Sequence, residues 1–207
     1  NFNLNQINNI SNLNSFILKI FLEEGHLMIN DRTIKITGVM QVGAAFCLEI
    51  EESIDSWEGN PIEVSVSVDP ERRKRVESHH TATHLMHWAL HQAIGPDVSQ
   101  QGSLVDQDRL RFDFNSEALS KEQLLAVEDI VNEKIKDNDL VSWTEVRHND
   151  IKDRSDIMQF FGDKYGEMVR VVQIGGNNND LDGYSMELCG GTHLKSTGEI
   201  ESFKIKT

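Results

Sequence analysis

Two pairs of potential metal ligands, far apart in the sequence, constrain the fold of this chain more than any other feature. His80 and His84 lie in SHHTATHLMHWAL, and Cys189 and His193 lie in ELCGGTHLKSTG. Positions i and i+4 of a helix lie above one another on the same face, so the two histidines of the first pair can reach one ion. The glycines inside the second pair allow the sharp turn that brings a thiolate and an imidazole together. We therefore expect a fold that joins these segments.

Three nitrogens and one sulfur form a ligand set that suits zinc better than magnesium or calcium. Either pair alone is weak evidence, but their joint occurrence predicts a zinc site. His87 and His91 fall on the same helical stripe as His80 and His84, and we interpret them as packing or solvent-lining groups. A zincin protease needs glutamate directly after the first histidine, where this chain has Thr81.

The composition limits the classes of function. The chain has 207 residues and a formal net charge of −14, with 38% hydrophobic and 26% charged residues. These values are typical of a soluble globular protein and argue against a broad basic surface for nucleic acid. A local basic run, Arg72-Arg73-Lys74-Arg75, is either a solvated helix start or a phosphate contact near the metal.

The cysteines and the apolar runs point to a location in the cell. There are two cysteines, of which Cys189 belongs to the metal motif and Cys47 lies in an apolar strand-like run. No disulfide framework is indicated, so a reducing, cytoplasmic location is expected. No apolar run approaches the ~20 residues that span a bilayer.

Hydrophobic patterning predicts an α+β fold with two parts. Residues 1–68 combine an asparagine-rich, irregular lead-in with a small antiparallel β-module, in which residues 33–37, 46–51 and 62–68 alternate apolar and polar side chains. Residues 69–207 mix helices and strands without a regular βαβ repeat.

Capping residues and patterning set the expected elements of the second part. Asp69 is the predicted N-cap of a helix that reaches about Ile94, and Ser120 with Gln123 forms a capping box for a helix that reaches about Asp137. The remaining elements are a short helix at residues 150–161 and strands at residues 98–105, 109–114, 140–146, 168–174 and 199–206.

Five motifs in order resemble one known family. HHTATHLMHWAL, SQQGSL, RLRFDF, FGDKYGE and CGGTHLKSTGEI closely resemble the editing domain of alanyl-tRNA synthetases, which also occurs in free-standing alanyl-tRNA editing proteins. Threonyl-tRNA synthetase editing domains share the layout of the two ligand pairs, but the CGGTH and RFDF wording is closer to the alanyl branch. The resemblance covers most of the chain after residue 68.

The resemblance implies roles for individual residues. The zinc ligands of the family fall on His80, His84, Cys189 and His193, and its pocket glutamine falls on Gln100. Thr81 follows the first ligand and is predicted to line the pocket, and Gln100 and Thr81 are the candidate catalytic residues. Arg111 and Asp113 match the family's R-F-D-F strand and are expected to support the pocket or contact substrate. Arg72 and Arg73 are candidate substrate contacts from the basic run described above, not from the resemblance.

By resemblance, the reaction is hydrolysis of the ester in alanine tRNA wrongly charged with serine or glycine. Two alternatives stay open. The first is a non-catalytic, zinc-stabilised tRNA-binding module or an inactive synthetase fragment, and the second is an unrelated metallohydrolase. The family's usual G-G-Q motif is missing from FLEEGHLMINDR, where Gly25 stands alone, and no motif of an ATP-dependent aminoacylation domain is present. The tRNA contact assigned to that loop is therefore in doubt here.

Overall fold

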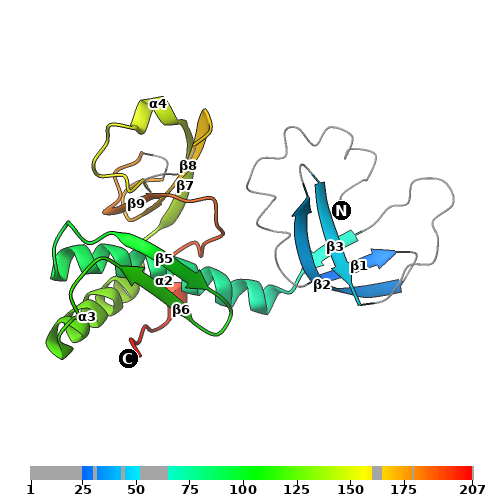
Figure 1. Ribbon diagram of the computed structural model, residues 1–207, viewed down its shortest axis with the longest axis horizontal. Coiled ribbons are helices and arrows are strands. Elements are labelled where there is room, and N and C mark those ends of the chain that lie inside the picture. The colour runs from blue at the N-terminus through cyan, green and yellow to red at the C-terminus, as the bar shows by residue number, and fades with distance from the viewer. Residues whose placement is uncertain are drawn as a thin grey trace. The chain divides into compact units, whose positions relative to one another are not determined.

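The structure, a computed structural model, describes residues 25–29, 32–42, 45–51, 65–159, 165–178 and 180–206. The chain divides into two compact units, Asn1–Arg73 and Lys74–Thr207. Helices accompany antiparallel sheets, so the predicted α+β class is confirmed (Figure 1). The asparagine-rich lead-in, the start of the predicted strand at residues 62–68 and part of FGDKYGE lie outside the described residues.

The first unit contains a four-stranded antiparallel sheet in the order β3-β2-β1-β4. Leu27, Ile34 and Ile36 are buried, while their neighbours along the strands are exposed, as the period of two requires. The strands are β1 (Gly25–Ile29), β2 (Arg32–Val42), β3 (Ala45–Ile50) and β4 (Ser65–Val68).

The long helix α2 spans Pro70–Ala93 and confirms the prediction made from its N-cap. The Asp69 carboxylate accepts hydrogen bonds from the backbone N–H groups of Glu71 and Arg72, both at 2.9 Å. The boundary between the units falls inside this helix, after Arg73, whereas the sequence predicts that the second domain begins at residue 69. None of the described helices has the length and apolar character needed to cross a membrane.

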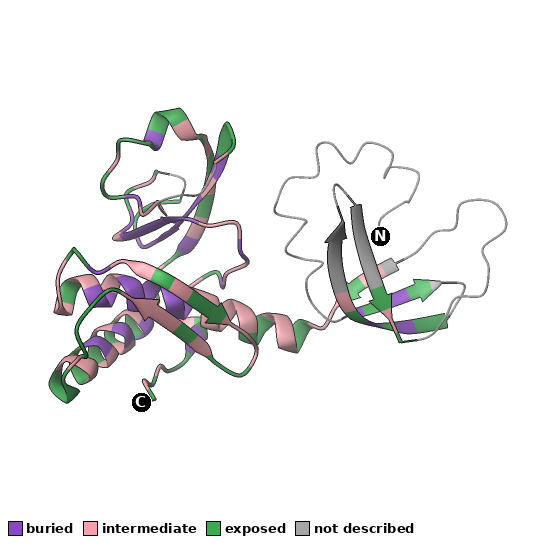
Figure 2. Cartoon of the chain, in the orientation of Figure 1, coloured by how far each residue is buried: buried purple, intermediate pink, exposed green. Residues whose placement is uncertain are grey.

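The second unit packs its two long helices against one face of a three-stranded sheet. Strand β8 is buried on both faces: Val172 and Ile174 join the core formed with the helices, whereas Val169 and Val171 pack with Ile151 on the other face (Figure 2). This unit contains the β5 (Gln100–Val105) and β6 (Leu110–Phe114) hairpin, α3 (Lys121–Asp137), β7 (Val141–Arg147), α4 (His148–Ile151), β8 (Met168–Ile174), β9 (Ser185–Leu188) and the 3-10 helix η2 (Thr197–Ile200). The Ser120 capping box begins α3 as predicted.

The predicted helix at residues 150–161 is wrong, because helical structure ends at Ile151. The chain then makes turns in which the Arg154 guanidinium bonds both the Asp156 carboxylate and the backbone oxygen of Leu181. Met158 forms a parallel bridge with Glu187. These contacts with a distant segment outweigh the local helical pattern.

The predicted last strand at residues 199–206 is also wrong. The chain forms η2 and then an irregular segment whose backbone bonds side chains of α3. The Asn132 amide donates to the Phe203 carbonyl oxygen and accepts from the Phe203 N–H, both at 2.9 Å, and the Glu128 carboxylate accepts from the Ile205 N–H. Side chains of a helix therefore satisfy the backbone groups that a neighbouring strand would have paired.

We expect Asn132→Ala to lower the free energy of unfolding by about 1–3 kcal/mol, because it removes two hydrogen bonds to the C-terminal segment. Urea unfolding of the variant and of wild type measures the difference. Asp129→Ala, at an exposed position of the same helix, is the control and should shift the midpoint little. Equal midpoints for Asn132→Ala and wild type would contradict this account of the C-terminal segment.

Candidate metal centre

Helix α2 carries the first ligand pair. His84 is 3% exposed and lies in a buried run of the helix, with Leu85 and Met86 beside it in the core. His80, one turn earlier, is partly buried, and the rings of His80 and His84 lie 5.3 Å apart between centroids. The i, i+4 spacing therefore places both imidazoles on one face, as the sequence predicts.

The second pair lies in the turn that follows β9. Cys189 extends the sheet by donating its N–H to the backbone oxygen of Arg170 at 3.0 Å, and the Arg170 guanidinium then donates to the carbonyl oxygen of Gly191. A Cβ at Gly191 would collide with the His80 ring. Only glycine lets this turn approach the helix closely enough to bring Cys189 and His193 to the helical histidines.

The four predicted ligands converge. One nitrogen of each histidine and the Cys189 sulfur all lie within 4.8 Å of one another. The sulfur is 3.4 Å from Nε2 of His80 and 3.5 Å from Nε2 of His193. This cluster of His80, His84, Cys189 and His193 could hold a metal ion, and its donor atoms are of the kind that zinc binds.

The outward nitrogen of each imidazole faces an oxygen atom. Such contacts fix the orientation of a ring and leave its other nitrogen for a metal. From Nδ1, the distances are 3.1 Å from His80 to the Thr192 carbonyl, 3.2 Å from His193 to the Thr81 hydroxyl and 3.6 Å from His84 to the Glu187 carboxylate.

The electrostatics of the cluster favour the protonation states that bind metals. Burial raises the pKa of the Cys189 thiol, but hydrogen bonds with His193 and His80 outweigh burial and hold this pKa well below its usual range. Burial and the neighbouring imidazoles hold the pKa of His193 well below its usual range. A thiolate and a neutral imidazole are the forms that coordinate a divalent ion.

Thr81 lies beside the cluster, whereas Gln100 lies in the hairpin. Thr81 is fully buried, and its hydroxyl accepts the Leu194 N–H at 3.1 Å while contacting His193. The Gln100 amide donates to the Ser103 hydroxyl at 3.3 Å, and no hydrogen bond between described residues joins it to the cluster. The catalytic roles of Thr81 and Gln100 stay predictions.

The predicted substrate contacts lie on β6 and at the start of α2. Arg111 and Asp113 form an ion pair at 3.1 Å on β6, and their side chains are 62% and 46% exposed. Arg72 and Arg73 lie in the first turns of α2, within the first unit. No hydrogen bond or ion pair between described residues joins these four side chains to the cluster.

Sequence reasoning missed Glu187. This carboxylate is 4% exposed in a strand whose four residues are all buried, and it lies 2.9 Å from Nδ1 of His87. A glutamate inside the short apolar run SMEL, two residues before Cys189, is the signal that could have revealed it.

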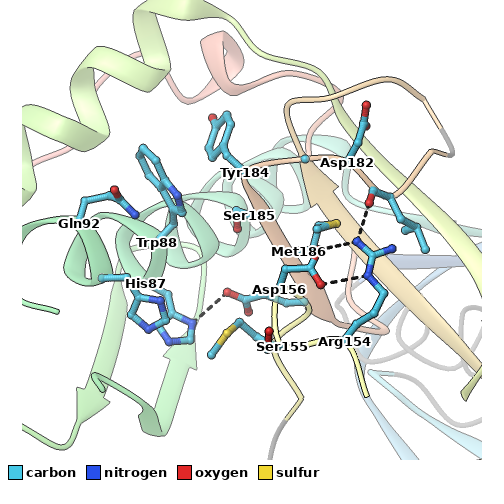
Figure 3. Close-up of a pocket in the computed structure, with 15 residues that line it drawn as sticks. His87, Trp88, Gln92, Arg154, Ser155, Asp156, Asp182, Tyr184, Ser185 and Met186 are labelled. Carbon is cyan, nitrogen blue, oxygen red and sulfur yellow. Dashed lines mark hydrogen bonds and ion pairs between the residues drawn. The ribbon is translucent and has the colours of Figure 1, made fainter. Parts of the chain in front are cut away.

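A pocket with a volume of about 460 Å³ lies next to the C-terminal half of α2 (Figure 3). Its walls come from the C-terminal half of α2, residues 154–158 and residues 181–187, and include His87 and Glu187. None of the four cluster residues lines it. The pocket and the cluster thus meet at Glu187, which contacts His84 and also lines the pocket.

The sequence of this chain is similar to domains of tRNA synthetases. Residues 169–207 match the family described as the threonyl and alanyl tRNA synthetase second additional domain. The chain is 48% identical over 187 residues to an alanine–tRNA ligase of Akkermansia muciniphila, which covers 89% of this chain and 20% of that protein. It is 43% identical over 185 residues to the enzyme of Methylacidiphilum infernorum, which covers 88% of this chain and 19% of that protein.

A third relative covers a smaller share. The alanine–tRNA ligase of Chlamydia trachomatis serovar D is 47% identical over 143 residues, which cover 69% of this chain and 15% of that protein. The chain spans a fifth or less of the length of these three relatives. It is homologous to the segment of alanine–tRNA ligases that carries the second additional domain.

Proposed function

We propose that this chain is a zinc-dependent aminoacyl-tRNA hydrolase that removes wrongly attached serine or glycine from alanine tRNA. The convergence of His80, His84, Cys189 and His193 in a homologue of alanine–tRNA ligases supports this proposal more than any other observation. An aminoacyl ester is labile, so a hydrolase needs to supply positioning and modest electrostatic stabilisation and not a strong nucleophile.

The cluster residues supply the binding part of this function. The Cys189 thiolate and the three imidazoles would hold zinc, and bound zinc supplies a Lewis acid for the ester carbonyl or an anchor for the amine or hydroxyl of the amino acid. Four protein ligands resemble a closed, structural site. Catalysis therefore requires one protein ligand, for example His193, to give up its position to water or substrate.

Other residues of the chain position the groups that react. Thr81 orients His193 through Nδ1 and holds the following backbone through the Leu194 N–H. Gln100 supplies an amide donor that can orient the ester. A pocket that bonds the serine hydroxyl leaves buried polar groups unpaired when alanine enters, which favours the mischarged substrate.

The charged side chains outside the cluster are proposed to contact the tRNA. Arg111 is exposed beside Asp113, and Arg72 and Arg73 carry two further positive charges at the start of α2. A net charge of −14 argues against a broad basic surface for nucleic acid, so phosphate contacts are expected from local positive charges such as these arginines.

Deacylation of two esters on the same alanine tRNA tests the proposal. We expect zinc-loaded protein to hydrolyse seryl-tRNA at least about tenfold faster than alanyl-tRNA, because only serine offers the hydroxyl. Protein stripped by a chelator and then reloaded with zinc is the control for the metal. Equal rates on both esters, or no hydrolysis by folded, zinc-loaded protein, would contradict an editing hydrolase.

A further inference from the structure

Glu187 is a buried carboxylate between two imidazoles. Its oxygens lie 2.9 Å from Nδ1 of His87 and 3.6 Å from Nδ1 of His84, and all three side chains are at most 5% exposed. No lysine or arginine within the described residues forms an ion pair with it. The two histidines are thus the groups that compensate its charge.

Packing alone does not account for a charged residue at this position. Burying a carboxylate costs several kcal/mol unless hydrogen bonds and opposite charge compensate, and an apolar side chain of similar size often serves stability as well. Val172, which pairs with Glu187 across β8 and β9 and lies on the same face of the sheet, is a buried apolar residue, so this face accepts apolar side chains. The carboxylate of Glu187 is therefore expected to have a role that an apolar side chain cannot perform.

The cluster supplies such a role, because its three imidazoles are oriented in the same manner. His80 faces a backbone carbonyl and His193 faces a hydroxyl, each through Nδ1. His84 faces Glu187, the one outer partner of the three that can carry a full negative charge. At 3.6 Å this contact is an ion-pair contact and is longer than a hydrogen bond. A carboxylate that faces the outer nitrogen of a ligand imidazole favours the tautomer with the proton on that nitrogen and leaves the other nitrogen to the metal.

We propose that Glu187 is a positioning residue that holds His84 for metal binding, and that His87 in turn holds Glu187. The proposal rests on the metal site of the proposed function. It concerns the affinity for the ion and the geometry around it, and these can be measured without any tRNA.

The environment of His87 supports its part in this arrangement. His87 is 2% exposed, and the Glu187 carboxylate is the hydrogen-bond partner of Nδ1. Nε2 of His87 is buried without a hydrogen-bond partner, on a residue that lines the pocket (Figure 3). The hydrogen bond between Nδ1 of His87 and the Glu187 carboxylate is therefore the polar contact of this buried imidazole, and it fixes the position of Glu187.

Zinc affinity of Glu187→Gln, measured by competition with a chromogenic chelator, tests the proposal. We expect the dissociation constant to rise about 10- to 100-fold, as for other residues that orient a metal ligand. The urea midpoint of the metal-free variant should not fall below that of wild type, because the amide keeps the shape of the side chain. Glu117→Gln, at an exposed glutamate, is the matched control and should bind zinc as wild type does.

A second set of variants examines His87 and remains informative if Glu187→Gln fails to fold. His87→Leu removes the donor to Glu187 and should weaken zinc binding, whereas His87→Asn offers an N–H near the place of Nδ1 and should restore most of it. Cobalt-loaded protein gives a spectroscopic readout, in which the visible absorption bands should change for Glu187→Gln and His87→Leu but not for His87→Asn.

The outcomes separate this proposal from the proposed function. Wild-type affinity and an unchanged cobalt spectrum in Glu187→Gln would overturn the positioning role while leaving the hydrolase untouched. The positioning role would also be overturned if Glu187→Gln lowered the urea midpoint by the same amount with and without zinc. Such a result indicates that Glu187 has a structural role alone. A wild-type chain that binds no zinc would overturn the metal site itself. A chain with the expected affinities but no deacylation would support the positioning role and contradict the hydrolase.

Discussion

Cys189→Ala should abolish zinc binding and hydrolysis of seryl-tRNA together. The thiolate is the one sulfur ligand of the cluster and lies between Nε2 of His80 and Nε2 of His193. Without it, only three imidazoles remain to hold the ion, and no ligand of the cluster carries a negative charge. We expect the zinc content to fall from about one equivalent per chain to below about a tenth, and the deacylation rate to fall to background. Metal analysis of the purified variant and a seryl-tRNA assay on the same sample measure both.

The other cysteine provides a control for the loss of a thiol. Cys47→Ala removes a cysteine outside the metal motif and should keep both zinc and hydrolysis. If Cys189→Ala kept its zinc and its activity, the assignment of the site would be wrong. A Cys189→Ala variant that lost zinc, stayed folded and still hydrolysed seryl-tRNA would show that the ion has no part in the reaction. The four-ligand site would then be a closed, structural zinc site.

The ligand set was predictable because each pair is local. The i, i+4 spacing of His80 and His84 needs only a helix, and Asp69 with Pro70 marks where that helix begins. The convergence of the two pairs is a tertiary fact that spacing alone does not determine. The joint occurrence of the two pairs suggested it, the family resemblance implied the same four residues, and the positions of Cys189 and His193 in the structure agree with it.

The elements that prediction missed depend on contacts with distant segments. Strand β9 has four buried residues and so lacks the alternation that identifies a strand with one exposed face. The residues after Ile151 leave the helical path because Met158 pairs with Glu187. The end of the chain bonds Asn132 and Glu128 and not a strand. In each place the partner lies far along the chain, where local patterning carries no information.

Gly191 was predicted to be a turn residue, but its close contact with the helix was not predicted. The sequence indicates backbone freedom between Cys189 and His193. In the structure, the constraint is the His80 ring, which occupies the space that any side chain at position 191 would need. The motif therefore requires a glycine in order to bring the turn against the helix.

Gly191→Ala should disrupt the metal centre although it changes no ligand. The added methyl group would collide with the His80 imidazole, so either the ring or the turn must move, and the turn is held by the Arg170 bond to the Gly191 carbonyl. Moving the ring breaks its contact with the Thr192 carbonyl and displaces Nε2 from the cluster. We expect zinc affinity to fall at least about 100-fold, with loss of the rise in melting temperature that zinc gives to wild type.

Gly166→Ala is the matched control, because among the described residues a Cβ there would meet just the Met168 carbonyl oxygen, at an ordinary distance of 3.6 Å. It should bind zinc as wild type does. Chelator competition on both variants measures the contrast, and melting curves with and without zinc show whether Gly191→Ala folds. If Gly191→Ala and Gly166→Ala bound zinc equally well, the turn could relax without cost. The close approach of the turn to His80 would then not be what sets the geometry of the four ligands.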